Sequence, residues 1–201
     1  MKRVVIKSSM ALMVSMSVWM AASVQAQQVT YVIDTGHSHV GFKVRHLVSN
    51  TRGNFKDFEG TITFDTEDFT TAKVTGTIQS ASIDTDHEKR DKHLRSGDFF
   101  DTEKYPTISF KSTKIAKTGK DTYAVWGDMT MHGVTKSVKL DAEYTGMATD
   151  PWGNEKLGLT VSGEINRLDY GIKWSKTLDT GGLVVGNEVK LLLEIEANKK
   201  K

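Results

Sequence analysis

Apolar and polar residues alternate with a period of two along most of the chain after residue 26. Val40, Phe42 and Val44 are each separated by one residue, and Leu191 and Leu193 repeat this spacing near the C-terminus. Because successive side chains of a strand point to opposite faces, the spacing predicts strands with one buried and one solvated face. Roughly nine segments follow it, whereas helical spacing is nearly absent. We therefore predict an all-β protein in which antiparallel strands form a sandwich or a closed barrel.

The longest departure from the alternation centres on the stretch from Asp84 to Arg95. Eight of its twelve residues carry a formal charge, and two more are His. A run of mixed charges predicts one or two solvated helical turns. Asp84, Thr85 or Asp86 can cap the N-terminus with a side-chain oxygen, and Gly97 can end the helix in a left-handed conformation. One short helix is therefore expected in an otherwise extended chain.

Two adjacent aromatic residues, Phe99 and Phe100, follow this helix and have Asp98 and Asp101 on either side. This arrangement indicates one ring tucked inward with its neighbours in water. We expect the stretch 82–101 to form a lid over one end of a barrel built by the other segments.

The first 26 residues have the pattern of a secretory signal peptide. A basic start is followed by an apolar run, and Val24-Gln25-Ala26 is a small-residue cleavage site. The alternative is a transmembrane anchor, but this needs about 20 apolar residues, and the run is shorter and interrupted by serines. We expect residues 1–26 to be removed on export to the periplasm, and residues 27–201 to form one soluble domain.

Composition narrows the classes of function. The expected leader holds three of the 27 basic residues and none of the 25 acidic ones, so the mature chain is close to neutral. A nucleic-acid-binding protein needs a concentrated basic face, and the overall charge gives no support for one. Cys is absent, so packing and strand pairing must hold the fold together.

Glycines at inward-facing positions leave two possibilities for the interior. Gly76, Gly127 and Gly163 fall in phase with buried residues, and Met129 and Met131 lie close to one of them. Glycine in a strand marks a bend or a close approach to the backbone, and Met adapts to irregular shapes. The combination favours a cavity for an apolar ligand, and a fully packed core is the alternative.

Several long motifs occur in order along the chain. They are DTGHSHVGF (34–42), GNFKDFEG (53–60), RDKHLRSGDFFD (90–101), YP (105–106), MHGVTK (131–136) and RLDYGI (167–172). Together they resemble the YceI-like family of bacterial secreted proteins, described as polyisoprenoid-binding, over essentially the whole mature chain. The resemblance implies an extended, lipocalin-like antiparallel barrel of about eight strands with an apolar tunnel. Its ligand would be a long isoprenoid chain, such as the tail of a quinone or a polyprenyl lipid.

On this basis we expect one set of side chains to line or seal the tunnel. The set consists of Phe42, Phe64, Ile78, Phe110, Trp126, Met129, Leu140 and Leu191. Trp126 is out of phase with Met129, so both can face inward only if a bulge lies near Gly127.

The lid supplies candidates for holding a polar headgroup at the mouth of the tunnel. They are Arg90, His93, Arg95, Asp98 and Phe99. Charges and hydrogen-bond donors at a mouth can hold a polar head. The alternative is a solvated helical turn with structural ion pairs.

Residue spacing gives little support for a metal site or an active site. His37 and His39 share a strand face and could bind zinc with a third ligand, but no Cys or carboxylate stands at a metal-motif spacing. A phosphate loop, a dinucleotide fingerprint and a Gly-x-Ser-x-Gly elbow are absent from the sequence. We therefore predict a periplasmic carrier without catalytic residues, metal or cofactor other than the bound lipid. A secreted stress-response interaction module and an isoprenoid-modifying enzyme are the alternatives.

The resemblance also bears on partners. Family members are encoded near b-type cytochrome membrane proteins, which implies such a partner and a role in quinone supply or stress response. A homodimer is a further expectation, and nucleic acid is not expected as a partner.

Overall fold

A computed structural model describes residues 27–175 and 184–201, so the expected signal peptide, residues 1–26, lies outside the described residues. The described residues form eleven strands, one α-helix and two short 3₁₀ helices. None of these helices is long and apolar enough to cross a membrane. The strands are β1 (Gln28–Ile33), β2 (His39–His46), β3 (Ser49–Phe55), β4 (Phe58–Asp65), β5 (Asp68–Gln79), β6 (Ile83–Asp84), β7 (Thr107–Lys117), β8 (Thr122–Met131), β9 (Val134–Thr149), β10 (Glu155–Asn166) and β11 (Val185–Lys199). The helices are η1 (Ser80–Ser82), α1 (Glu88–Arg95) and η2 (Arg167–Tyr170).

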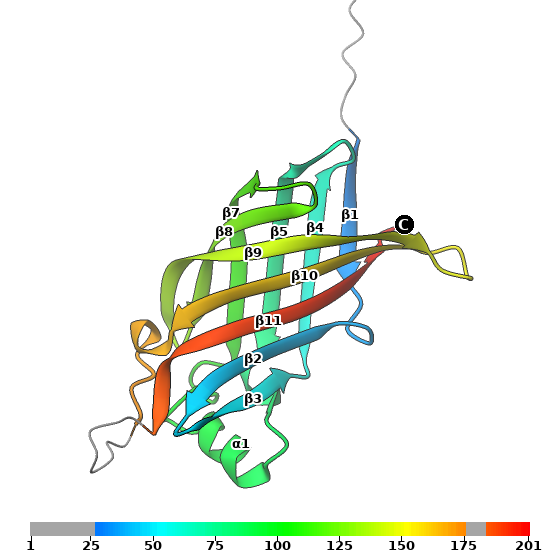
Figure 1. The fold of residues 1–201 in the computed structure, drawn as a ribbon. Coiled ribbons are helices and arrows are strands. Elements are labelled where there is room, and N and C mark those ends of the chain that lie inside the picture. Colours follow the sequence, from blue (N-terminus) through cyan, green and yellow to red (C-terminus); the bar gives the residue numbers. More distant parts are fainter. Residues whose placement is uncertain (1–26, 176–183) are drawn as a thin grey trace, which may run out of the picture.

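Eight of these strands close into an antiparallel barrel (Figure 1). Strands β1, β4, β5, β7, β8, β9, β10 and β11 pair in this order, and β11 pairs with β1 to complete the circle. Closure pairs β1 with β11, so β1 does not present an exposed edge along the residues that pair. The predicted all-β barrel of about eight strands with one short α-helix is confirmed.

Strand β11 has two partners along one of its edges. Its first part pairs with β2, and its last residues, Ala197 to Lys199, pair with β1. Strand β3 pairs with β2 and adds a further strand beyond it. As Figure 1 shows, β2 and β3 thus continue the wall below the end of β1, on the side where α1 lies.

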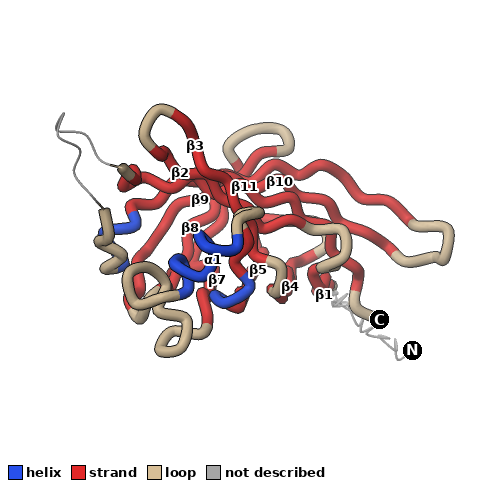
Figure 2. The backbone as a smooth tube through the Cα atoms, turned by 90° about the horizontal axis from the view of Figure 1, so that it is seen from below, coloured by secondary structure: helices blue, strands red, loops and turns tan. Residues whose placement is uncertain are grey.

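Helix α1 lies over one end of the barrel, as seen in Figure 2. Its N-cap is His87, whose Nδ1 accepts a hydrogen bond from the backbone N–H of Arg90 at 3.3 Å. The helix ends at Arg95, and its C-cap, Ser96, has an extended backbone. A short helix at this place was predicted, but both of its ends differ from the prediction.

None of the three predicted caps is the N-cap, and two of them form other hydrogen bonds. Asp84 accepts from the N–H of Asp86 at 2.9 Å, and Thr85 donates its N–H to the carboxylate of Asp91 at 3.0 Å. Asp86 itself has a left-handed backbone, with φ of 57°. Gly97 has no positive φ, whereas Asp101 has a φ of 46°. The helix therefore ends at Arg95 without a left-handed glycine, and the left-handed residue that follows it is Asp101.

Phe99 and Phe100 both pack inward. Phe99 is buried, and the ring of Phe100 meets that of Phe55 edge to face at 5.8 Å between centroids. Asp98 remains exposed, as expected. The lid is therefore held by two rings, because the prediction that only one of them tucks under is wrong.

Candidate functional site

The barrel encloses a cavity of about 540 Å³. This is within the range of roughly 300–1,000 Å³ that is common for small-molecule sites. Most of its lining side chains are apolar and come from strands all round the barrel. The cavity rather than the fully packed core is thus the arrangement that the structure shows.

Six of the eight residues predicted for the tunnel lie in the cavity wall. They are Phe42, Ile78, Phe110, Met129, Leu140 and Leu191. Phe42, Ile78, Phe110 and Leu191 are only partly buried because they face this internal space. That these side chains contact a ligand remains a prediction.

Two glycines keep the cavity open by letting rings lie against the wall. A Cβ built on Gly53 would stand 2.6 Å from Cζ of Phe42, and one built on Gly127 would overlap the ring of Phe110. Both rings therefore occupy space that any larger residue at 53 or 127 would take. Gly76 is different, because a Cβ there would meet nothing nearer than a backbone oxygen at 3.7 Å.

Trp126 lies outside the cavity, which corrects its prediction. Val125 and Met129 line the cavity from β8, and successive side chains of a strand point to opposite faces, so Trp126 faces outward. There Nζ of Lys114 lies 5.0 Å from the ring centroid of Trp126. The pairing of β7 with β8 does shift near Gly127, but the extra residue is Thr113 on β7, so the phase of β8 is unchanged.

Phe64 does not line the cavity, but it shares the buried face of β4 with Ile62, which does, so it lies inside the barrel at one side of the cavity. Its ring stacks on Tyr31 at 5.7 Å and meets Phe69 at 4.9 Å, and Phe69 in turn meets Tyr123 at 5.0 Å. Phe69 lines the cavity. These four rings pack together on the side of the interior away from α1 and help to seal it.

Near α1, exposed polar residues line the cavity. His87, Lys89 and Arg90 are exposed and belong to the cavity wall, so the cavity reaches the surface here. This end is called the mouth below. Arg90 donates to the hydroxyl of Thr85 at 2.7 Å and to its carbonyl at 2.6 Å, which fixes its guanidinium beside the opening. His87 and Lys89 were not predicted, although they lie in the charged run that predicted the lid.

Three rings pack together at the mouth. His93 lies 5.0 Å from both Phe99 and Trp174, and these two lie 5.1 Å apart. All three line the cavity. Trp174 was missed by the sequence reasoning, although its two-residue spacing from Ile172 continues the apolar alternation. Asp98 lies outside the wall and orients His93, with Oδ2 2.8 Å from Nε2.

Arg95 has a structural role that differs from the headgroup contact predicted for it. Its guanidinium donates to the carbonyls of Ala81 and Ile83, at 2.7 Å and 2.6 Å. Arg95 does not line the cavity. It ties the end of α1 to the segment that precedes the helix.

Arg167 is a buried cation in the cavity wall that sequence reasoning did not single out. It is 4% exposed, and burial lowers the pKa of its guanidinium. It donates to the carbonyls of Ile172 and Trp174 on one side, and to those of Val185 and Gly186 on the other. It therefore joins residues 172–174 to residues 185–186 at the mouth.

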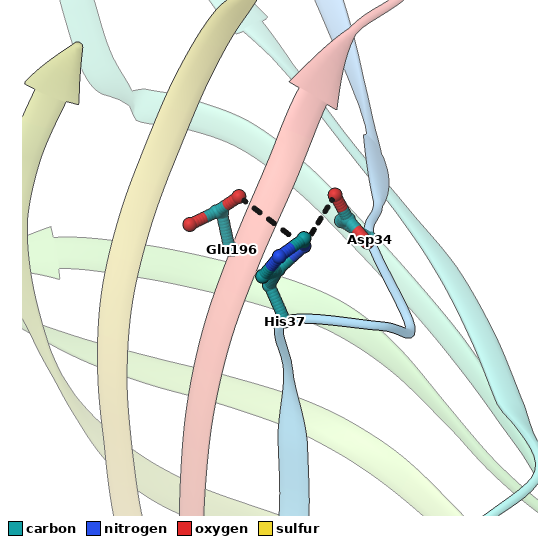
Figure 3. A group of neighbouring side chains, drawn as sticks. All are labelled: Asp34, His37 and Glu196. Atoms are coloured by element: carbon teal, nitrogen blue, oxygen red, sulfur yellow. Dashed lines mark hydrogen bonds and ion pairs between the residues drawn. The ribbon is translucent and has the colours of Figure 1, made fainter. Parts of the chain in front are cut away.

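Three potential metal ligands lie together on the opposite side of the fold from α1. Among the residues that the structure describes, Asp34, His37 and Glu196 are within reach of a common ion (Figure 3). Nζ of Lys156 lies 2.8 Å from Asp34 and 2.9 Å from Glu196, between the two carboxylates. Its hydrogen bond holds the pKa of the Asp34 carboxyl well below its usual range. Lys156 already balances these acids, so the arrangement is an ion network joining β10, β11 and the turn after β1. His39, paired with His37 in the sequence argument, is not part of it.

Comparisons with known proteins agree with this architecture. The model of the YceI-like domain matches residues 31–197. The UPF0312 protein plu2095 of Photorhabdus laumondii is 43% identical over 182 residues, covering 90% of this chain and 91% of the relative. The crystal structure of the Campylobacter jejuni YceI protein is 38% identical and superposes with a TM-score of 0.69, covering 84% of this chain and 96% of that one. A polyisoprenoid-binding domain from Saccharophagus degradans shares the fold with a TM-score of 0.59 at 15% identity, covering 85% of this chain and 98% of that domain.

Proposed function

The chain belongs to the family of YceI-like domains, and from that premise we propose that it binds one long isoprenoid lipid in its barrel and carries it. The observation that supports this most is the apolar cavity of about 540 Å³, backed by aromatic rings away from α1 and reaching the surface at the mouth. A structural relative with the same fold is described as polyisoprenoid-binding. We further propose that the carrier acts in the periplasm, with residues 1–26 as its export signal.

The energetics of an isoprenoid tail are sufficient for this role. Micromolar affinity corresponds to about 8 kcal/mol. Removing one CH₂ unit from water contributes roughly 0.8 kcal/mol, so a tail of tens of carbons exceeds this in gross terms. The excess can offset the cost of immobilising the ligand. A closed apolar barrel therefore needs no strong polar contact to hold its cargo.

The headgroup is proposed to lie at the mouth. Arg90 and His93 offer nitrogen donors there, and the rings of Phe99 and Trp174 offer flat apolar surfaces. Asp98 orients His93 through its hydrogen bond, and Arg95 fixes the end of α1 by bonding to the segment before the helix. A polar head would thus stay near water while its tail occupies the interior.

The test is to measure lipid in the purified protein after a charge is placed in the cavity wall. Phe110→Asp should reduce extractable isoprenoid at least roughly tenfold, because a carboxylate is costly next to an apolar tail. Native mass spectrometry and solvent extraction measure the lipid, and far-ultraviolet circular dichroism checks that the β-fold is retained. Trp126→Asp is the matched control, because it makes the same change on the outer face and should leave lipid content unchanged.

Unchanged lipid in Phe110→Asp would contradict the assignment of the cavity. A folded wild-type protein that never contains lipid would favour an interaction module. Chemical conversion of an added isoprenoid would favour an enzyme.

A further inference from the structure

The connection between β2 and β3 carries two apolar side chains at its tip. His46 pairs with Ser49, so Leu47 and Val48 form a two-residue turn, called the hairpin tip below. Leu47 is 41% exposed and Val48 is 90% exposed. Both residues therefore present apolar surface to the surroundings of the barrel.

These residue types are poor choices for the turn itself. Leu47 has a φ of 48°, in the left-handed region that non-glycine residues rarely adopt. Two-residue hairpin turns strongly favour Asn-Gly or similar pairs, because those residues tolerate positive φ. Leu-Val thus gives up local stability and leaves apolar atoms in water. A role outside the fold explains why such residues stand here.

The chain around the hairpin tip is basic. Residues 35–56 contain no Asp or Glu, and they include Lys43, Arg45 and Arg52. Arg45 and Arg52 are exposed, and Nε of Arg45 donates to the carbonyl of Leu47 at 2.8 Å, so this charge is held at the hairpin tip. Among the described residues, neither arginine forms an ion pair with an acid. The nearby helix α1 carries both signs, so the positive character belongs to the hairpin.

The hairpin tip adjoins the mouth of the cavity. His46 and Val184 line the cavity, and the N–H of Leu47 donates to the carbonyl of Val184 at 3.0 Å. In Figure 1, the β2–β3 turn lies at the same end of the barrel as α1, beside the start of β11. A molecule leaving the cavity at this end passes close to the hairpin tip.

We propose that the hairpin tip docks the mouth of the barrel on an anionic lipid bilayer. A small apolar projection flanked by arginine is what the interface of such a bilayer accepts: the apolar side chains enter the headgroup region and the cations meet the lipid phosphates. A protein partner fits less well, because a stable interface buries about 800 Å² on each partner, far more than two side chains supply. Docking here lets an apolar cargo pass between membrane and cavity with little exposure to water. The proposal goes beyond cargo binding, since an empty barrel would dock as well.

The test measures partition of the full mature chain onto vesicles. Wild-type protein should cosediment with phosphatidylglycerol–phosphatidylcholine vesicles, and less with pure phosphatidylcholine or at high salt. The double variant Leu47→Asn/Val48→Gly places a favourable pair in the turn. It should lower binding roughly tenfold without lowering the thermal midpoint. Arg45→Gln/Arg52→Gln should lower binding to anionic vesicles about 25-fold, a factor of roughly five for each charge.

Trp152→Ser is the matched control. Trp152 is 83% exposed in the β9–β10 connection, which projects away from α1 in Figure 1, so its loss should not change vesicle binding. Equal binding to neutral and anionic vesicles, or unchanged binding of Leu47→Asn/Val48→Gly, overturns the proposal. Self-association that disappears in this variant would also overturn it, by assigning the hairpin tip to a second copy of the chain. Lipid content of the same samples separates the two proposals: loss of docking with cargo retained refutes only the docking surface, and docking without any cargo refutes only the carrier.

Discussion

The ring of Phe110 lies where a side chain on Gly127 would stand. The two residues come from β7 and β8, neighbouring strands of the barrel wall. Because the glycine has no Cβ, the ring can lie against the wall instead of pointing to the centre. The same relation holds between Phe42 and Gly53. At the scale of single residues, the cavity thus depends on where side chains are absent as much as on which apolar ones are present.

Gly127→Ala should therefore lower both the stability of the fold and the amount of lipid that the cavity can hold. The new methyl group must push the Phe110 ring into the cavity, and overpacking of this kind costs about 1–3 kcal/mol. We expect a lower free energy of unfolding in urea and less isoprenoid per protein by mass spectrometry. Gly76→Ala is the control, because its Cβ meets no atom within 3.7 Å and should cost far less stability. Equal losses in both variants would show that the ring does not depend on Gly127.

Asp34 makes folding stability depend on pH in the acid range. The hydrogen bond from Lys156 holds the pKa of Asp34 below its unfolded value of about 4. Its contribution is therefore fully present above about pH 4 and is lost as the pH falls through the lower folded pKa. Asp34→Asn should reduce the free energy of unfolding by about 1–3 kcal/mol at neutral pH, and should flatten its decline below pH 4.

Urea denaturation at pH 7 and at several values below pH 4 measures both effects. Asp141→Asn provides the comparison, since Asp141 pairs with Lys139 on the exposed surface, where an ion pair contributes about 0–1 kcal/mol. If the free energy of unfolding of Asp34→Asn declines below pH 4 as steeply as that of the wild type, Lys156 does not stabilise the folded carboxylate.

At the scale of elements, β11 and the segment before it organise the mouth. Strand β11 pairs with β2 near the mouth and with β1 at the far end. Arg167, at the start of η2, donates to the carbonyls of Trp174 and Gly186. The Arg167 side chain thus holds together two chain segments, one of which brings Trp174 and the other Val185 to the cavity wall.

Arg167→Lys should loosen this part of the mouth. An ammonium group cannot reproduce the planar fork of donors, and the carbonyls left without a partner should cost about 2–4 kcal/mol of unfolding free energy. Hydrogen exchange should show faster opening of the amides at 172–174 and 184–187, with less change in β4 and β5. Arg52→Lys, on an exposed side chain, should have neither effect. Unchanged protection of these amides from hydrogen exchange would show that Arg167 does not hold the two segments together.

Predictability also differs from element to element. Strands such as β8 were predictable because Val125, Gly127 and Met129 alternate with polar or outward residues. Strand β3 shows no such alternation, since it contains Asn50, Gly53 and Asn54 and is held extended by pairing with β2. The caps of α1 were mispredicted because Thr85 and Asp91 form a buried pair, and burial is not visible in a run of charged residues.

For the molecule as a whole, the two ends of the barrel differ in chemistry. Aromatic rings from β1, β4, β5 and β8 pack behind the cavity away from α1. The mouth combines rings, nitrogen donors and the basic β2–β3 hairpin. Binding of an isoprenoid and docking on an anionic bilayer, both proposed above, would give this polarity a function: cargo enters and leaves at one end only.

The sequence by itself determined the class of fold and the inward face of most strands, because side-chain alternation is a local property of extended backbone. It also identified, through its motifs, the family and six residues of the cavity wall. Only the tertiary structure decided that the barrel closes through β11 and β1, that Trp126 faces outward, and that Arg167 and Trp174 reach the mouth. These depend on strand register and on contacts between distant segments, and no local pattern specifies either. Whether side chains fill the centre of the barrel also depends on distant residues. Phe110 and Gly127, for example, come into contact only when β7 and β8 pair in this register.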